Sequence, residues 1–156
     1  MDKTTLLAFL LLLTNNAYSQ QYVNSTKSSA KKSFIKYADK KNFKTITKET
    51  DSTLAFLVRD PTVQTLDILL HFDTQGKCDR ELTSLSCDSC YHKILSCTLS
   101  NKYYRWTKVD GNTYYARFPY RLVLTTKPDT PFSFLIQRST LAGYEYRRII
   151  KNVLSK

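Results

Sequence analysis

The sequence predicts an α+β protein in which an antiparallel β-sheet carries two or three helices on one face. Two observations lead to this fold class. Several short runs are rich in Thr, Val, Ile and aromatic side chains and are separated by turn signals, which is typical of antiparallel strands. Three other segments, near the start, middle and end of the chain, repeat apolar residues at the spacing of an amphipathic helix.

Residues 1–19 are expected to be a cleavable secretion signal and not part of the fold. A polar start is followed by an unbroken apolar run at 6–13 and by a small-x-small cleavage site, Ala17-Tyr18-Ser19. The run is far shorter than the roughly 20 residues that a membrane-spanning helix needs, so no integral membrane segment is expected in the mature chain. The mature protein is therefore predicted to be secreted or periplasmic.

The mature chain has the length of one domain. Cleavage after residue 19 leaves 137 residues, enough for a real hydrophobic core. Residues 20–28 are rich in Ser, Thr and Asn and are predicted to form a flexible mature N-terminus. Residues 29–156 are predicted to form a single α+β domain.

The first helix is predicted to start at Ser28 or Ser29, because a serine side chain can cap the first turn. Four apolar residues at helical spacing are expected to face the core, with lysines between them facing water. These core residues are Ala30, Phe34, Ile35 and Ala38. Strands are predicted next at 43–48, 53–59, 62–72 and 77–86, the last two joined by a turn at 73–76.

The second helix is predicted to be capped by Asp88 or Ser89 and to bury one stripe of its surface. That stripe is Tyr91, Ile94, Leu95, Thr98 and Leu99. Strands are predicted at 103–109, 113–118, 120–126 and 132–138, with a hairpin turn at 110–112. A third helix closes the chain, with Tyr146, Ile149, Ile150 and Val153 facing inward.

The two halves of the chain repeat one pattern. A shift of sixty residues superposes Thr47-Lys48 on Thr107-Lys108 and Thr53 on Thr113. Each half is then a helix followed by an antiparallel meander. Two such units can share one sheet with their helices packed on one face.

The positive charge is concentrated in the second half of the sequence. The formal net charge is +11, and residues 89–156 contribute twelve Lys and Arg against three Asp and Glu. Residues 20–88 are nearly balanced, with eleven against nine. This charge favours encounter with nucleic acid, acidic polysaccharide or lipid headgroups. We expect the partner to be an anionic envelope polymer or surface.

Arginines alternate with aromatic residues on neighbouring predicted strands of the second half. Alternate side chains of a strand point to one face, so these strands could present a basic face that also bears aromatic rings. Such a face can stack on sugars or bases while its cations meet acidic groups. The predicted anion-binding face consists of Arg105, Arg117, Arg121, Tyr104 and Tyr115.

Cys78, Cys87, Cys90 and Cys97 lie close together in the sequence and are expected to form two disulfides in an exported protein. Joining Cys78 to Cys87 and Cys90 to Cys97 is disfavoured, because each pair is too far apart along one strand or one helix. The favoured pairing is Cys78–Cys97 with Cys87–Cys90, since a Cys-x-x-Cys at a helix start can close locally. Cys78–Cys90 with Cys87–Cys97 stays open, as does one disulfide with two buried thiols.

A second interpretation gives Cys87 and Cys90 a catalytic role. A strand, a Cys-x-x-Cys and a helix form the local setting of thiol–disulfide oxidoreductases, in which the helix N-terminus lowers the pKa of the first thiol. Asp88 opposes a thiolate by charge repulsion, and the βαβ order of such enzymes is missing. The spacing also disfavours a four-cysteine zinc site, so no metal and no cofactor are expected.

Motifs of the common hydrolases and nucleotide-binding enzymes are missing from the sequence. The chain has three glycines, without a Gly-x-Ser-x-Gly elbow or a phosphate-binding glycine loop. His71 and His92 are expected to be structural. A non-enzymatic binding or structural module with a basic face is therefore the favoured function. A thiol–disulfide oxidoreductase-like protein is the alternative.

The chain combines a basic leading helix, the hairpin Phe72-Asp73-x-x-Gly76-Lys77-Cys78 and a Cys87-Asp88-Ser89-Cys90 motif before a helix. With the short signal that ends in Ser-Gln-Gln, these features resemble small uncharacterised exported proteins of Bacteroidota-type bacteria. The resemblance implies an exported protein of this organisation. That group has no assigned activity, so the resemblance implies no reaction.

Overall fold

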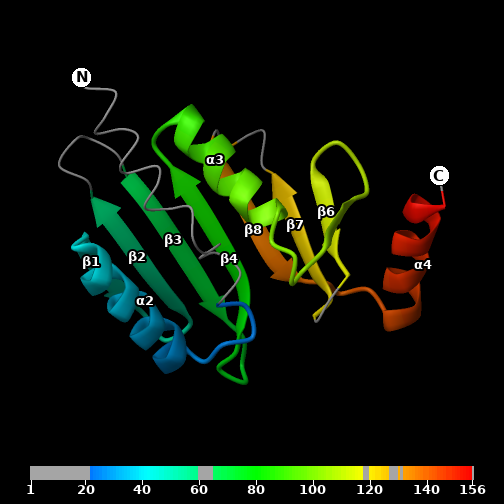
Figure 1. Cartoon of the computed structure of the whole chain (residues 1–156). Coiled ribbons are helices and arrows are strands. Elements are labelled where there is room, and N and C mark those ends of the chain that lie inside the picture. The colour runs from blue at the N-terminus through cyan, green and yellow to red at the C-terminus, as the bar shows by residue number, and fades with distance from the viewer. Residues whose placement is uncertain (1–21, 60–64, 118–119, 127–129, 131, 156) are drawn as a thin grey trace.

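The computed structural model describes residues 22–59, 65–117, 120–126, 130 and 132–155 (Figure 1). These residues form one eight-stranded antiparallel sheet and three helices, which confirms the predicted α+β class. The predicted signal at 1–19 lies outside the described residues.

Each of the predicted strand runs contains a strand of the sheet. The agreement is best for the second run, which is found from Thr53 to Arg59 as predicted. The run predicted to begin at Tyr103 starts later, because residues 102–104 form a turn. The strands are β1 (Lys44–Glu49), β2 (Thr53–Arg59), β3 (Thr65–Phe72), β4 (Cys78–Leu85), β5 (Trp106–Lys108), β6 (Thr113–Ala116), β7 (Leu122–Thr126) and β8 (Ser133–Arg138).

The strand order is β1-β2-β3-β4-β8-β7-β6-β5, so two meanders run outward from a central pairing of β4 with β8. Thr83 of β4 lies opposite Phe134 of β8 in this pairing. Each meander follows a helix, and Thr53 opens β2 as Thr113 opens β6, in agreement with the sixty-residue repeat. The helices are α2 (Lys27–Lys41), α3 (Asp88–Leu99) and α4 (Gly143–Leu154).

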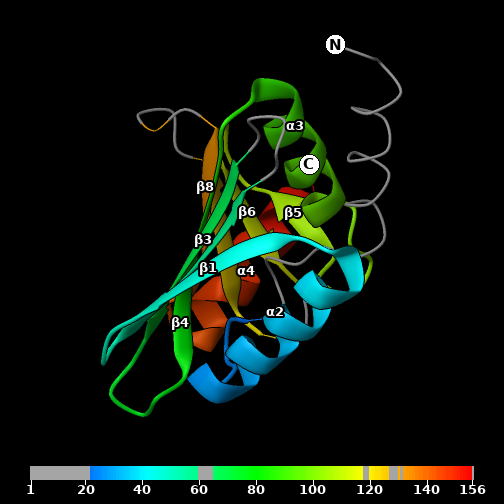
Figure 2. The same cartoon turned by 90° about the vertical axis from the view of Figure 1, so that its left-hand side faces the viewer.

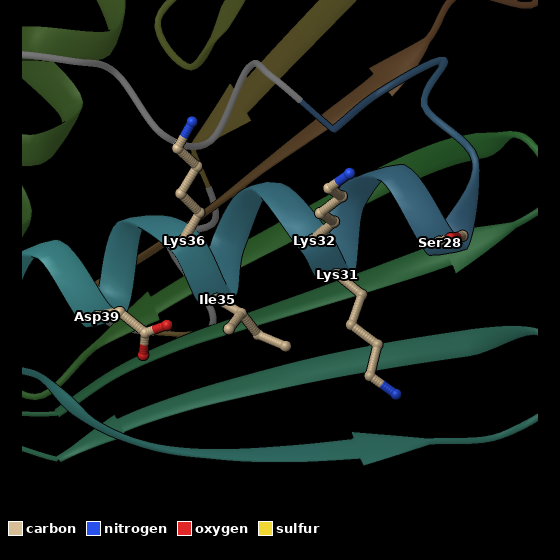
Figure 3. Close-up of a pocket in the computed structure, with 6 residues that line it drawn as sticks. All are labelled: Ser28, Lys31, Lys32, Ile35, Lys36 and Asp39. Carbon is tan, nitrogen blue, oxygen red and sulfur yellow. The ribbon is translucent and has the colours of Figure 1, made fainter.

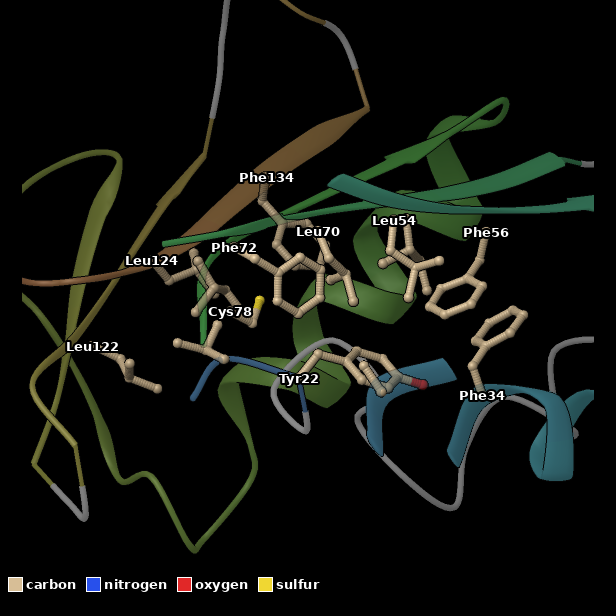
Figure 4. Packing of buried hydrophobic residues seen from close by; sticks show 14 of the residues in the cluster. Tyr22, Phe34, Leu54, Phe56, Leu70, Phe72, Cys78, Leu122, Leu124 and Phe134 are labelled. Atoms are coloured by element: carbon tan, nitrogen blue, oxygen red, sulfur yellow. The ribbon is translucent and has the colours of Figure 1, made fainter. Parts of the chain in front are cut away.

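Helices α2 and α3 cover the same face of the sheet, which we call the inner face (Figure 2). Phe34 of α2 stacks on Phe56 of β2 with ring centroids 3.9 Å apart. Tyr91 of α3 lies near Phe134 of β8, at 6.4 Å between centroids. Figure 4 shows the side chains of the strands meeting Phe34 and the buried Tyr22 in this layer. The hydrophobic core therefore lies between the inner face and these two helices.

Helix α2 begins slightly earlier than predicted and buries a narrower stripe. Its N-cap is Thr26, whose side chain accepts the backbone N–H of Ser29. The other three predicted core positions are buried, but Ile35 is 41% exposed. Because consecutive residues on a helix differ in direction by about 100°, Ile35 cannot face the sheet together with Phe34. The prediction that Ile35 belongs to the core is wrong.

Helix α4 lies on the outer face, the side of the sheet opposite α2 and α3. Tyr114 and Ala116 of β6 contribute to the core, so Tyr115 between them points to the outer face. There its ring packs on that of Tyr146 of α4, with centroids 4.9 Å apart. Tyr146 is buried, as predicted, and the adjacent Arg147 is exposed.

Replacing Tyr146 by phenylalanine is expected to lower the free energy of unfolding by about 1–2 kcal/mol. The Tyr146 hydroxyl lies 2.8 Å from the carbonyl oxygen of Ala116 and 2.6 Å from that of Leu122, and burial raises its pKa, so it remains a donor. The variant leaves these buried acceptors with one donor fewer. Urea unfolding measures the change, with Tyr144→Phe as control because Tyr144 is 65% exposed. Equal effects of the two variants would contradict the prediction.

The segment before α2 is fixed against the sheet. The N–H of Asn24 donates to the carbonyl of Cys78 at 2.8 Å, and the N–H of Cys78 donates to the carbonyl of Ser25 at 2.8 Å. Tyr22 is 1% exposed and Val23 is also buried. This arrangement differs from the flexible N-terminus predicted for 20–28, because one aromatic and one aliphatic side chain anchor an otherwise polar segment.

Candidate anion-binding site

Most cations of the second half have no carboxylate partner among the described residues. Among the described residues, every ion pair uses a carboxylate from the range 49–88, and the second half contributes only His92 and Arg138 to these pairs. Most of the other second-half cations in the described ranges gather on β5–β7, the loops beside them and α4, at one end of the molecule (Figure 1), whereas Lys93 lies on α3. We call this surface the cationic end, and its residues are Arg105, Lys108, Arg117, Arg121, Arg147, Arg148 and Lys151.

The structure does not bring the two predicted tyrosines onto this surface. Tyr104 is 7% exposed and stacks on Trp106 with centroids 5.9 Å apart. Burial raises the pKa of Tyr104 to about 12, so the hydroxyl is uncharged at neutral pH. Tyr115 lies under α4 against Tyr146. The two tyrosine rings therefore pack against other aromatic side chains, while the arginines that alternate with them in the sequence point to solvent.

The three predicted arginines are exposed, in different settings. Arg105 lies in the loop between α3 and β5 and has a φ of 48°. Arg117 donates from Nε to the hydroxyl of Thr107 at 3.0 Å. Arg121 donates from Nη1 to the carbonyl of Leu141 at 2.7 Å, just before α4. Of the three, Arg121 also lines a pocket.

This pocket, which we call the arginine pocket, lies where the start of β7 and the end of β8 meet the segment before α2. Its volume is about 260 Å³, and its lining is Asn24, Tyr120, Arg121, Arg138 and Ser139. Each of these side chains carries at least one N–H or O–H donor. The Nδ2 atom of Asn24 is buried, and the described part of the chain offers it no acceptor. The pocket therefore suits a ligand that accepts hydrogen bonds.

Both arginines of the pocket are held in place by contacts on one side. Nη2 of Arg138 donates to Oδ2 of Asp73 in the β3–β4 hairpin, while Oδ1 of Asp73 accepts two backbone N–H groups of the turn at 2.9 Å. These hydrogen bonds, that from Arg138 first, lower the pKa of Asp73 and keep it charged. Arg121 is held by the carbonyl of Leu141. A guanidinium has five N–H donors, so each arginine retains donors beyond these contacts.

A second cationic surface lies along α2 (Figure 3). A groove of about 530 Å³ is lined there by Lys32 and Lys36 among others. Lys31 pairs with Glu49 at 2.8 Å, whereas Lys32 and Lys36 pair with no carboxylate of the described ranges. Figure 3 shows Lys32 and Lys36 on one side of the helix and Lys31 on the other. The described lining comes from a single helix, so its donors do not converge as those of the arginine pocket do.

Cys87 and Cys90 form a disulfide, with Cα atoms 5.3 Å apart, which is the local pairing favoured above. Cys78 and Cys97 are free thiols, so the expected Cys78–Cys97 bond is not formed. Cys78 is buried at the start of β4 and its thiol donates to a backbone carbonyl at 3.3 Å. Cys97 precedes the buried Thr98 on α3 and is itself only partly buried. The state found is therefore one disulfide with two thiols, of which Cys78 is buried, as that alternative expected, and Cys97 is only partly buried.

Alkylation of the native protein at about pH 8 is expected to modify Cys97 and to spare Cys78. Burial raises the pKa of Cys78 to about 12, so almost no thiolate forms at that pH, and the side chain is 0% exposed. Cys87 and Cys90 should react only after reduction. Mass spectrometry of the modified peptides measures this, with the denatured protein as the control in which Cys78 reacts. Rapid modification of native Cys78 would contradict the structure.

Sequence reasoning missed a buried carboxyl group, that of Glu81. It is 0% exposed and lies between Leu70 of β3 and Ile136 of β8 on the inner face. Neither of its carboxyl oxygens has a hydrogen-bond partner among the described residues. Burial raises the pKa of Glu81 well above its ordinary value, which favours the neutral acid. The alternation of Glu81, Thr83 and Leu85 along β4 was the sequence signal for its position.

No protein-family model matches the chain, and no curated protein or solved structure is significantly similar to it. Within the described ranges, no group of three or more His, Cys, Asp and Glu side chains is placed to hold a metal ion. The helices of the same ranges are too short or too polar to span a membrane. The inference of function therefore rests on the geometry and charge of the surfaces described above.

Proposed function

We propose that the mature protein is a non-enzymatic, exported binding module that holds an acidic partner on the cationic end. The observation that carries the proposal is the set of cations on β5–β7 and α4 that have no carboxylate partner in the described chain. Uncompensated positive charge attracts polyanions and speeds their association. An extended polymer can contact many of these cations at once, so an anionic polymer of the cell envelope is the partner class favoured.

The cationic end also stands on a rigid frame, which supports a binding role. The hydroxyl of Tyr146 on α4 hydrogen-bonds the carbonyls of Ala116, at the end of β6, and Leu122, at the start of β7. Arg121, just before β7, hydrogen-bonds the carbonyl of Leu141, just before α4. Cations carried by fixed elements lose less conformational entropy on binding than cations on a mobile tail. The frame therefore presents its charges in a fixed pattern to a partner.

Binding of the mature protein to pectate and to polyphosphate, measured from about 20 to about 200 mM salt, tests the proposal. The logarithm of the affinity should fall linearly with the logarithm of the salt concentration. Arg147→Gln/Arg148→Gln removes two exposed cations of α4 and should weaken binding about tenfold at low salt, reducing the salt slope by about two.

The matched control is Lys32→Gln/Lys36→Gln, which removes the same charge from the α2 surface. It should weaken binding by less than about threefold. The proposal fails when neither polymer binds at the lowest salt, when binding does not respond to salt, or when the α2 variant loses more affinity than the α4 variant.

A thiol–disulfide exchange function is the second candidate, and one contact favours it. Cys87 is the N-cap of α3, and its sulfur accepts the backbone N–H of Cys90 at 3.1 Å. After reduction this N–H and the positive end of the helix dipole would stabilise a thiolate at Cys87. The side chain of Asp88 lies in the same turn and pairs with His92 at 3.2 Å, which reduces its repulsion of that thiolate when His92 is protonated.

The reduction potential of the Cys87–Cys90 pair and the pKa of the Cys87 thiol decide between the two roles. A structural bridge should have a potential below about −300 mV and leave inert thiols, whereas an exchange catalyst needs a higher potential and a thiol pKa near or below 7. We expect the structural result. A Cys87→Ser/Cys90→Ser variant should then retain polymer binding.

A further inference from the structure

We infer that the arginine pocket binds the carboxylate of one acidic sugar unit, and so selects a polyuronate among anionic polymers. The choice of a polymer rests on the proposed function, while the choice of a carboxylate rests on the pocket itself.

The first argument is the direction of the hydrogen bonds. Nδ2 of Asn24 is buried without an acceptor in the described chain, and guanidinium donors come from Arg121, just before β7, and from Arg138, at the end of β8. Their contacts to Leu141 and Asp73 orient the guanidinium groups before a ligand arrives. An arginine can bind a carboxylate through two parallel N–H bonds, which gives strength and a fixed geometry. The pocket is therefore preorganised for an oxyanion.

The second argument is the charge of the pocket. Asp73 has a lowered pKa and stays ionised, so its charge balances that of Arg138. Arg121 pairs with no carboxylate in the described chain and leaves a net charge of one. The net positive charge of the pocket therefore neutralises the single negative charge of a carboxylate. It would neutralise only part of the nearly two negative charges that a phosphate monoester carries at neutral pH.

The third argument is the shape and size of the pocket. About 260 Å³ is less than the usual volume of a drug-sized site and suits one sugar ring. A carboxylate hangs from a uronate ring as a side group and can enter a pocket. The phosphodiester of a nucleic acid is substituted on two sides and presents its oxygens to open grooves. Tyr120 lines the pocket and is 49% exposed, which leaves part of its ring for contact with the sugar.

NMR titration of the mature protein with D-glucuronate tests the pocket without a polymer. The side-chain NH₂ signals of Asn24 and the Nε–H signal of Arg121 should shift and saturate at millimolar concentration. Arg121→Lys keeps the charge but loses the forked donor geometry, and it should weaken binding about tenfold. Asn24→Gly removes the amide and tolerates the φ of 75° at this position, and it should weaken binding about fivefold.

The matched control is Arg117→Gln, a neighbouring arginine of the cationic end that does not line the pocket, and it should bind D-glucuronate within about twofold of the wild type. Amide spectra of each variant establish that it is folded. The inference is overturned if D-glucuronate shifts none of the pocket signals, if Arg121→Lys binds as the wild type does, or if inorganic phosphate binds the pocket more tightly than D-glucuronate.

The polymers separate this inference from the proposed function. At equal concentration of anionic groups, Arg121→Lys should weaken the binding of pectate more than the binding of polyphosphate. If both polymers bind equally and Arg121→Lys has no effect, the proposed function stands and the pocket assignment falls. If D-glucuronate fills the pocket but neither polymer binds, the pocket assignment stands and the proposed function falls.

Discussion

Replacing Phe34 by alanine is expected to lower the free energy of unfolding by about 3–5 kcal/mol. Phe34 is 1% exposed, and its ring stacks on Phe56 at 3.9 Å between centroids, which makes it the main aromatic contact between α2 and the sheet. Alanine would leave a cavity that the strands on one side and the helix on the other cannot close. Urea unfolding followed by far-UV circular dichroism measures the loss.

The adjacent residue provides the control. Ile35 is 41% exposed on the same turn, so Ile35→Ala should change the free energy of unfolding by less than about 0.5 kcal/mol. The two substitutions differ by one position and remove apolar side chains from the same helix. A larger loss for Ile35→Ala than for Phe34→Ala would mean that α2 is rotated from the orientation found here.

Replacing Glu81 by leucine is expected to raise the free energy of unfolding at about pH 8 by about 2 kcal/mol more than at about pH 4. Its folded pKa is raised above 4.5, so at acid pH the carboxyl is protonated in both states and only the smaller cost of burying the neutral acid without hydrogen-bond partners remains. As the pH rises past 4.5 the unfolded chain releases the proton while the folded chain retains it. The free energy of unfolding of the wild type therefore falls with pH until the folded pKa is reached. Leucine cannot ionise, so the variant does not lose stability in this way, and its side chain can pack between Leu70 and Ile136.

Urea unfolding across this pH range measures the effect, with two further variants to assign it. Glu81→Gln removes the ionisation without adding apolar volume, so it should also flatten the pH profile. Glu49→Gln removes an exposed carboxyl whose pKa is lowered by Lys31, so any loss should appear at neutral pH and vanish in acid, with the opposite sign of slope. A wild-type stability that rises steadily from about pH 5 to pH 8 would contradict the assignment to Glu81.

The strands were predictable because their signals are local. Gly76 adopts the φ of 71° that the β3–β4 turn requires, and Asp110 accepts the N–H of Asn112 at 2.9 Å in the β5–β6 turn, as the turn residues indicate. In the last strand, Phe134 and Ile136 alternate with Leu135 and Gln137 and lie in the core, which is the pattern of a strand with one buried face. Turn residues and the alternation of apolar and polar residues depend only on neighbours in the sequence, so a single sequence is enough to predict the strands and turns.

It was harder to predict which side chains point into the core, because tertiary contacts decide this. Two adjacent apolar residues, Phe34 and Ile35, fit the helical spacing equally well, and only the position of α2 over β2 selects the first. Tyr104 lies in a turn before β5, where period-two alternation does not apply, and it packs inward on Trp106. Tyr115 alternates correctly, but α4 covers the face to which it points.

The arginine pocket was only partly predictable for a related reason. Arg121 was identified from its position among aromatic strands, but Asn24 and Arg138 were not. Arg138 ends a strand and takes its partner, Asp73, from a hairpin in the other half of the chain. That contact exists because β4 pairs with β8, and no local pattern indicates which two meander edges will meet. Asn24 joins the pocket through the backbone pairing of its segment with Cys78.

The strand order also determines the sequence in which the protein can assemble. Within each meander, paired strands are neighbours in the chain and close short loops, whereas Thr83 and Phe134 must be brought together across the whole second half. Loop closure costs more entropy as the intervening segment lengthens, and such long-range pairings slow folding. We therefore expect the two meanders to form early and nearly independently. The pairing of β4 with β8, which turns two half-sheets into one, is expected to be the late and rate-limiting event.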